Sequence, residues 1–266
     1  MLRKAKIRCW DVVRGTYEEL LREMEEWRKD GAVHTVCFCD GNGLPRAWWG
    51  DKELRAAYQQ ADAVCADGIA VDFLAKMCSG KSGRIIGPKL FPAALEYGVS
   101  RGWRHFFYGA DEATLAALKA KMEERFPGVK IIGTFAPEFS PDPQPPPSNS
   151  TYDFLWVGLG CPKQEKWCAR HKNEVNAPVL LAVGAAFDFL AGKVPETPEW
   201  VHKIGMCWFW RLLTGGRRVF VRNVKCVSAA LGVLVVEFVR IRILRKAIAE
   251  DDSRTANWNM EEHRDN

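Results

Sequence analysis

The stretch Asp153-Phe-Leu-Trp-Val-Gly-Leu-Gly-Cys-Pro-Lys-Gln-Glu-Lys-Trp167 decides the fold of this 266-residue chain. Phe154 to Val157 is apolar without polar alternation, which is typical of a strand buried on both faces of a parallel sheet. Gly158-Leu-Gly160 ends the strand. Pro162 suits the first position of a helix, and good helix formers follow it. The stretch therefore predicts a strand, a glycine turn and a helix N-terminus.

Such a unit directs backbone N–H groups and the positive end of a helix dipole at one point, at the sheet edge where phosphates bind. Lys163 and Gln164 would stand at this point. The alternative is an ordinary strand–helix turn in which both side chains are solvated. Two glycines without a full dinucleotide fingerprint do not decide between these alternatives.

Strands and helices alternate along the rest of the chain. Helices are predicted over 16–29, where Thr16 and Glu19 form a capping box, over 54–60, 69–78 and 112–126, and after Arg84 with Pro88 near the start. Strands are predicted over residues 33–39, 63–66, 105–108, 129–133 and 179–183. The proline-rich segment 139–150 is expected to be a surface loop. The pattern predicts a doubly wound, mostly parallel, Rossmann-like α/β domain over about residues 1–195.

Polar residues follow two of the predicted strands. Asp40-Gly-Asn42-Gly-Leu comes after the strand at 33–39, at a position where ligand contacts are often found. Asp67-Gly68 comes after the strand at 63–66. A carboxylate there is either a turn or cap residue, or the catalytic acid or base of an α/β enzyme. The residues alone leave both roles open.

Cysteine usage indicates the compartment. The chain has nine cysteines, an odd number, with no Cys-x-x-Cys pair, and it opens on Met-Leu-Arg-Lys without a secretory signal. We therefore expect a reducing cytoplasm in which cysteines serve as small apolar residues. No zinc-ligand spacing and no internal repeat is present, and we expect neither a bound metal nor a cofactor.

The positive charge is concentrated near the C-terminus. Residues 200–249 carry ten Lys or Arg and one acidic residue, a local net charge of +9 in a chain whose total is +5. Aromatic residues accompany this charge, and residues 226–236 form an uncharged run of 11 residues. A bilayer core needs about 20 residues, so this run is too short to span it.

We expect residues 196–250 to form a helical appendage that lies in the membrane interface through about residues 200–246, with its cations on the headgroups. The alternatives are a helix packed on the α/β domain or a dimer face, so a homo-oligomer stays open. Nucleic acid is a poor partner, because the basic residues accompany an apolar run instead of a stacking platform. Residues 251–266 are polar and expected to be disordered.

Several motifs together resemble the WecG/TagA/CpsF glycosyltransferases, glycosyltransferase family 26. They extend over about residues 30–225 and include Asp67-Gly-Ile69, Arg84-Ile-Ile-Gly87, Gly158-Leu-Gly-Cys-Pro-Lys-Gln-Glu165, Phe187-Asp188-Phe, Pro198-Glu-Trp200 and Trp208-Phe-Trp-Arg211. The Gly-Leu-Gly-x-Pro-Lys-Gln-Glu block is the most specific of them.

The resemblance implies an inverting enzyme, cytoplasmic and peripherally attached to the inner face of the membrane, that works without a metal. It would move a sugar from a nucleotide donor, expected to be UDP-linked, onto a polyprenyl-diphosphate-linked sugar during surface polysaccharide or teichoic-acid-type biosynthesis. By position, Asp67 matches the general base and Gln164 the active-site glutamine, while Arg211, Arg218 and Arg222 would bind the diphosphate. The residues expected to bind the nucleotide sugar are Asp40, Asn42, Arg84, Gly109, Gly158, Gly160, Lys163, Glu165 and Asp188.

The sequence departs from the family pattern near the expected pocket. The departures are Cys37 and Cys39 in place of Thr-x-Asn, Lys89 for an aspartate, Glu196 in place of the arginine of Arg-Ala-Pro, and Cys207 for an acid. They leave the donor sugar, the acceptor sugar and the linkage open. They also leave a second hypothesis open, namely that the protein is associated with the membrane and binds a nucleotide sugar without catalysis. A nicotinamide oxidoreductase is disfavoured, because no Gly-x-Gly-x-x-Gly follows the first strand.

Overall fold

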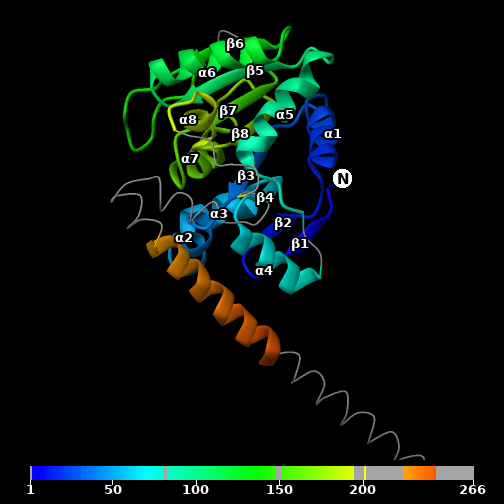
Figure 1. Cartoon of the computed structure of the whole chain (residues 1–266), viewed down its shortest axis with the longest axis vertical. Coiled ribbons are helices and arrows are strands. Elements are labelled where there is room, and N and C mark those ends of the chain that lie inside the picture. Colours follow the sequence, from blue (N-terminus) through cyan, green and yellow to red (C-terminus); the bar gives the residue numbers. More distant parts are fainter. Residues whose placement is uncertain (1, 81–82, 148–150, 195–200, 202–223, 244–266) are drawn as a thin grey trace, which may run out of the picture.

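The computed structural model describes residues 2–80, 83–147, 151–194, 201 and 224–243. Its centre is a six-stranded sheet of order β4-β3-β8-β7-β5-β6 in which every neighbouring pair is parallel (Figure 1). The strands are β3 (His34–Cys39), β4 (Ala63–Ala66), β5 (Arg104–Gly109), β6 (Lys130–Phe135), β7 (Phe154–Gly158) and β8 (Val179–Ala182). The predicted parallel α/β fold is confirmed.

The strand of the stretch 153–167 lies in the middle of this sheet. Strand β7 pairs with β5 on one side and β8 on the other, and its residues from Phe154 to Val157 are fully buried. Trp156 Nε1 donates to His105 Nδ1 at 3.1 Å on the neighbouring strand. Burial lowers the pKa of His105 to about 3, so the imidazole is neutral and can accept this bond. Because residues 154–157 are buried on both faces of the sheet, their sequence shows no alternation of polar and apolar side chains.

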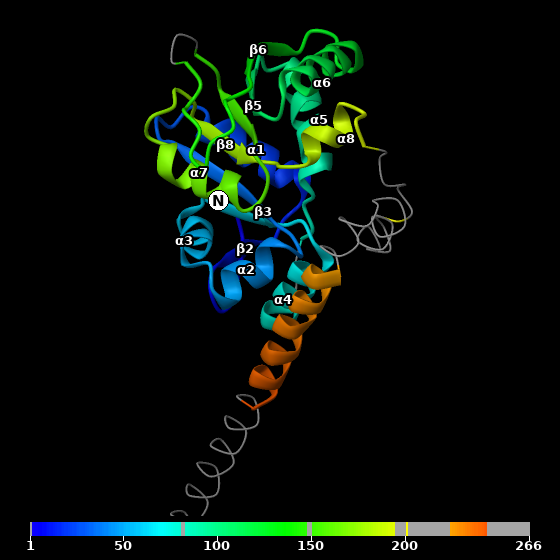
Figure 2. The same cartoon turned by 90° about the vertical axis from the view of Figure 1, so that its left-hand side faces the viewer.

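Helices cover both faces of the sheet (Figure 2). One apolar core contains side chains of α1 (Tyr17–Trp27), α5 (Gly87–Val99), α6 (Glu112–Arg125) and α8 (Ala186–Leu190). The other contains side chains of α2 (Gly43–Trp49), α3 (Lys52–Gln60), α4 (Ile69–Ser79) and α7 (Lys163–His171). The predicted capping box of Thr16 and Glu19 is present at the start of α1.

Besides the five-residue helix α8, two elements were not predicted. One is the antiparallel hairpin of β1 (Lys4–Lys6) and β2 (Asp11–Val13), whose three-residue strands are too short to show an alternation. The other is helix α2, which follows glycine and asparagine residues that resemble a plain turn. Asp40 Oδ1 accepts the N–H groups of Asn42 at 2.9 Å and Gly43 at 2.8 Å. The Asp40 carboxylate thus satisfies N–H groups at the start of α2, as an N-cap side chain does.

Two local expectations need correction. Pro162 is the N-cap of α7, which begins at Lys163, so the proline lies one position before the predicted place. The proline-rich segment forms no strand over its described part, as predicted, but it is not only a surface loop. Pro143 is buried, and its carbonyl accepts the indole N–H of Trp167 at 2.7 Å. The backbone of this segment satisfies a buried donor.

Residues 224–243 form a helix that packs on the hairpin and α4 and then extends away from the body (Figures 1 and 2). Ala230 and Val233 enter the core that contains the hairpin. Glu237, with 1% of its side chain exposed, binds Arg8 at 3.5 Å and Arg240 at 3.0 Å. Within the described part of the chain, we find no helix long and apolar enough to cross a membrane.

The Glu237 carboxylate is predicted to hold this helix against the hairpin. Glu237→Gln removes the charge and leaves two arginines facing a buried neutral group. Because both arginines are about half exposed, the cost is about 1–2 kcal/mol, less than for a fully buried pair. Amide hydrogen exchange of residues 224–243 should accelerate roughly 5- to 30-fold.

The exposed pair of Lys119 and Glu123, 3.8 Å apart on α6, provides the control. Glu123→Gln should leave the exchange of both α6 and residues 224–243 nearly unchanged. If Glu237→Gln behaved in the same way, the carboxylate would have no docking role.

Candidate active site

Parallel pairing brings the ends of five strands to one edge of the sheet. The register pairs Cys39 with Ala66, Val157 with Ala182, and Gly109 with Gly158. The loops after β3 and β4 touch directly, because the N–H groups of Asp67 and Gly68 both donate to the Cys39 carbonyl, at 3.0 and 3.3 Å. Here the polar residues predicted at strand ends come together.

Gly68 is required by this close approach. A Cβ on Gly68 would lie 2.9 Å from the backbone nitrogen of Gly41 and 3.2 Å from the Cα of Asp40. Any side chain would therefore push apart the two loops that carry Asp40 and Asp67.

Asp67 is held by the start of another helix. Its Oδ1 accepts the N–H of Gly87, the first residue of α5, at 2.9 Å, and its own carbonyl accepts from Arg84 Nε at 3.1 Å. It does not cap the helix that follows it, because the N-cap of α4 is Gly68. The carboxylate thus combines a cap-type bond to α5 with a place at the sheet edge, and the catalytic assignment stays a prediction.

No sequence pattern predicted a place in the site for Tyr17, which also belongs to this neighbourhood. The hydroxyl oxygen of Tyr17 accepts the N–H of Ile86 at 2.9 Å, one residue before α5. Burial is the main cause of a raised pKa for Tyr17, and the negative charge of Asp67 adds to it. A contact across 69 positions leaves no local pattern by which it could be predicted.

Gln164 ties the glycine loop to the next strand. Its Oε1 accepts the N–H of Gly160 at 3.0 Å, and its Nε2 donates to the Ala182 carbonyl at 2.8 Å and to Glu165 Oε1 at 3.0 Å. Only 3% of the residue is exposed, so the alternative of a solvated Gln164 is wrong. Gly184, with φ of +58°, passes so close that a Cβ there would stand 3.0 Å from the amide.

Glu165 is fully buried next to this amide. Burial, reinforced by the nearby negative charge of Asp40, raises its pKa to about 8, although hydrogen bonds from Gln164 and Cys161 act in the opposite direction. The carboxyl group is therefore mainly protonated at neutral pH. A group without exposed surface supports the loop from within the core, and its contact with a nucleotide sugar stays a prediction.

The three predicted loop glycines differ in their surroundings. A Cβ on Gly109 would lie 2.6 Å from the carbonyl oxygen of Gly158, and one on Gly158 would lie 2.5 Å from the Phe187 ring. These two glycines permit close packing. Gly160, with φ of +82°, has open space where a Cβ would point, so the backbone there is accessible to a ligand.

The remaining predicted residues divide into two groups. Lys163 is half-buried, with its Nζ 5.2 Å from the centroid of the Phe139 ring, and Asp188 lies in the first turn of α8. Arg211, Arg218 and Arg222 lie outside the described residues. Within the described ranges, no cluster of three or more His, Cys, Asp or Glu side chains could hold a metal ion.

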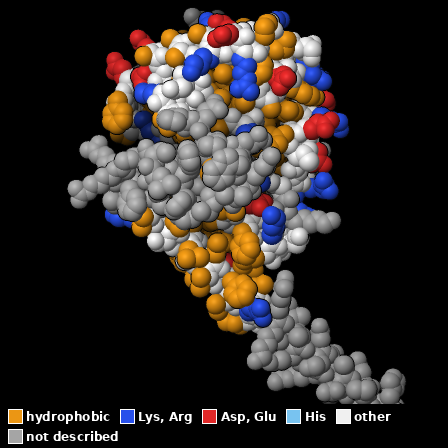
Figure 3. All heavy atoms as spheres, in the orientation of Figure 1, with side chains coloured by type: hydrophobic (Ala, Val, Ile, Leu, Met, Phe, Trp, Pro, Cys, Tyr) orange, Lys and Arg blue, Asp and Glu red, His pale blue; other side chains and the backbone are white. Residues whose placement is uncertain are grey.

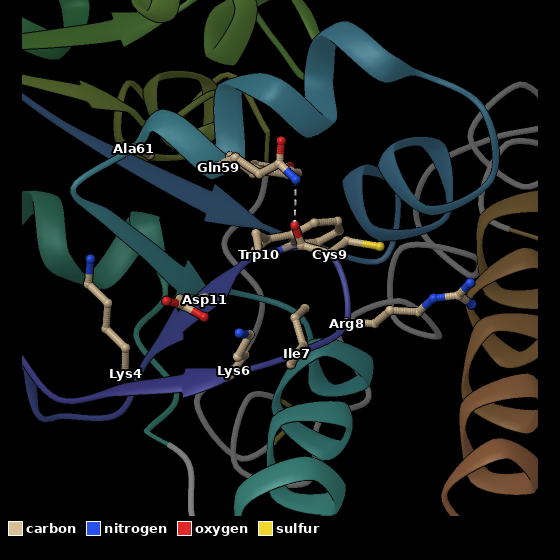
Figure 4. Close-up of a pocket in the computed structure, with 10 residues that line it drawn as sticks. Lys4, Lys6, Ile7, Arg8, Cys9, Trp10, Asp11, Gln59 and Ala61 are labelled. Carbon is tan, nitrogen blue, oxygen red and sulfur yellow. Dashed lines mark hydrogen bonds between the residues drawn. The ribbon is translucent and has the colours of Figure 1, made fainter. Parts of the chain in front are cut away.

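A surface pocket of about 230 Å³ lies elsewhere, between the hairpin and the end of α3 (Figure 4). Its walls include Lys4, Lys6 and Arg8. Gln59 and Ala61, also in the wall, come just before β4 in the chain, so the pocket lies near the amino end of that strand. It is therefore at the other end of β4 from Asp67 and does not belong to the candidate site.

Known proteins share this sequence pattern. The sequence model of the Glycosyl transferase WecG/TagA/CpsF family matches residues 7–243. A relative from Bacillus spizizenii is 30% identical over 168 residues, which cover 61% of this chain and 65% of the relative. Relatives from Bacillus subtilis and Staphylococcus aureus are 25% identical over 167 and 178 residues, covering 61% and 60% of this chain and 65% and 64% of those proteins.

All three relatives are named N-acetylglucosaminyldiphosphoundecaprenol N-acetyl-beta-D-mannosaminyltransferase. The matches span slightly less than two thirds of their length. The family match, in contrast, includes the hairpin tip, the whole parallel sheet and residues up to the end of the described C-terminal helix. The chain therefore belongs to the WecG/TagA/CpsF family of glycosyl transferases.

Proposed function

We propose that this protein transfers a sugar from a nucleotide donor, expected to be UDP-linked, onto a polyprenyl-diphosphate-linked sugar at a membrane surface. The observation that carries the proposal is the family match, combined with the position of Asp67 at the sheet edge beside the N-terminus of α5. The names of the relatives support an acceptor of the N-acetylglucosaminyl-diphosphoundecaprenol class.

In this proposal Asp67 is the general base. Its carboxylate would take the proton of the attacking acceptor hydroxyl while the acceptor oxygen bonds to the anomeric carbon and the nucleotide diphosphate departs. A single displacement of this kind inverts the anomeric configuration. The Gly87 N–H fixes the orientation of the carboxylate, and the Arg84 guanidinium binds the adjacent carbonyl.

The leaving diphosphate would meet positive ends of backbone dipoles. The Gly160 N–H already donates to Gln164, so the positive end that the diphosphate would meet is the N-terminus of α7, next to the loop that the Gln164 amide fixes. A preorganised helix dipole of this kind stabilises developing negative charge. Arg211, Arg218 and Arg222 remain the proposed diphosphate ligands, on the basis of their sequence positions.

The departures from the family pattern differ in their expected effect. Cys37 and Cys39 are fully buried in β3, so these two substitutions alter core packing. Lys89 lies in the first turn of α5, two residues after the Gly87 that binds Asp67, and is half-buried. Glu196 and Cys207 lie outside the described residues. Lys89 is therefore the departure best placed to alter the choice of substrate, because it adds a positive charge two residues after the Gly87 that binds the proposed base.

Residues 224–243 are proposed to attach the protein to the membrane. Seven of their large apolar side chains are exposed, and they form an apolar surface at the lower end of the molecule (Figure 3): Val224, Leu231, Val235, Val236, Phe238, Val239 and Ile243. An amphipathic helix with such a face, and with Lys225, Arg240 and Arg242 at its flanks, suits the headgroup boundary of an anionic membrane.

The role of Asp67 gives a first test. Asp67→Asn keeps an oxygen that can accept from Gly87 N–H but cannot take a proton, so turnover should fall about 10²- to 10⁴-fold with donor binding retained. Nucleotide diphosphate release is measured with a short-chain polyprenyl-diphosphate-linked N-acetylglucosamine.

The matched control is Asp111→Asn, at the N-cap of α6, where asparagine caps as well as aspartate. It should retain near-parent turnover. Normal turnover of Asp67→Asn would remove the base assignment. Donor binding without release by the parent enzyme would favour the non-catalytic alternative.

The raised pKa of Glu165 gives a second test. The proton binds more tightly in the folded state than in the unfolded chain, where the pKa is near 4.5. This contribution to stability is complete below that value and is lost as the pH rises towards and through about 8. The free energy of unfolding of the parent should therefore fall between pH 5 and 8.5. The fall should be a few kcal/mol larger than in Glu165→Gln, because glutamine has no proton to lose.

The two melting curves are compared at matched pH values, so that all other titrating groups cancel. Parallel curves over the whole range would show that Glu165 is ionised in the folded protein.

A further inference from the structure

The exposed face of α4 is apolar, and neither the family match nor the resemblance assigns a role to it. Ile69 and Phe73, one turn apart, are 45% and 52% exposed, and the half-buried Met77 follows one turn later. The opposite face packs into the core through Val71, Leu74 and Ala75. An isolated exposed apolar residue is ordinary, but a row along one helix face indicates a binding surface.

This row lies next to the C-terminal helix. Both views show α4 and residues 224–243 side by side (Figures 1 and 2). The Cys78 thiol on α4 has a pKa raised first by burial and then by the negative charge of Glu237, which agrees with the neighbouring positions of the two helices in these views. At the other end, the Cys226 thiol donates to Asn42 Oδ1 at 3.4 Å, which brings the helix to the start of α2.

The distribution of apolar surface singles out this region. The described residues include thirteen large apolar side chains that are exposed, and ten of them lie on α2, α4 and the C-terminal helix: Trp49, Ile69, Phe73 and the seven of residues 224–243. The other three are Ile132, Phe139 and Val194. One continuous lipid-facing surface explains this concentration better than separate protein contacts do, because it adjoins the proposed membrane helix and carries exposed cations, Lys76 and Arg242 among them.

We propose that α4 inserts its Ile69–Phe73 face into the same lipid interface as residues 224–243, so that two neighbouring helices contact the membrane. This inference rests on the proposed membrane function and extends it. Ile69 is two residues after Asp67, so insertion of α4 holds the Asp67 carboxylate at the depth of the lipid headgroups. A diphosphate-linked sugar whose hydrocarbon tail stays in the bilayer presents its hydroxyl groups at that depth.

The test uses the full chain and vesicles of phosphatidylcholine with phosphatidylglycerol. The double change Ile69→Ser and Phe73→Ser should lower the vesicle partition coefficient roughly tenfold or more, since two half-exposed apolar side chains no longer enter lipid. Ile132→Ser is the matched control, because Ile132 is 42% exposed on β6, at the end of the molecule opposite α4 (Figure 1). It should bind vesicles as the parent does. In the parent, vesicles should also slow amide exchange in residues 69–79.

Two results would overturn the inference. One is an unchanged partition coefficient for the folded double variant, whose folding is checked by its melting temperature. The other is a parent dimer that dissociates in the double variant while vesicle binding persists, which would make this face a contact between copies of the chain.

Transfer assays separate this inference from the proposed function. The double variant should keep parent-like turnover on a short soluble acceptor and lose it selectively on an acceptor held in vesicles. A parent without any transfer would refute the proposed function, and vesicle binding would still report on α4. Equal loss on both acceptors would place the defect in the catalytic site and would contradict the positioning role of α4.

Discussion

All six strands of the central sheet run in the same direction, and the rest of the site depends on this constraint. A parallel sheet sends every strand–helix connection to one edge, so Asp40, Asp67, Gly160 and Gly184 gather there although they are spread over 145 positions. The loops are then held together by hydrogen bonds from backbone N–H groups to the Cys39 carbonyl and to the Gln164 amide. Glycines at the points of closest approach make these contacts possible.

Buried polar groups beneath the loops hold the loop backbone in one conformation. Gln164 uses both of its N–H donors inside the protein, and Glu165 is protonated because burial makes its charge costly. The two neighbours in the Lys-Gln-Glu sequence therefore support the backbone that a diphosphate would meet. The motif is specific because exchange of either residue would leave a buried polar group without a partner.

Much of this could be predicted from the sequence, because it follows from local patterns. The parallel fold, the capping box of α1 and the gathering of Asp40 and Asp67 at one edge rest on strand-like runs, turn residues and caps. The burial of Gln164 and Glu165 could not be predicted, since it depends on β8 and α3 closing over α7. Nor could the bond between Asp67 and Gly87 or the one between Tyr17 and Ile86. The exposure of the apolar row of α4 could not be predicted either, since apolar residues at helical spacing are also expected of a core helix.

The proposed reaction is a single displacement in which a base at the sheet edge activates the acceptor while the membrane holds it in place. The anomeric configuration of the product tests this claim most directly. The parent protein is incubated with a panel of UDP-sugars and a short polyprenyl-diphosphate-linked N-acetylglucosamine, and the new glycosidic linkage is examined by proton NMR. We expect a product longer by one sugar, with inverted configuration and one nucleotide diphosphate released for each linkage formed. A product with retained configuration, or hydrolysis of the donor without transfer, would contradict it.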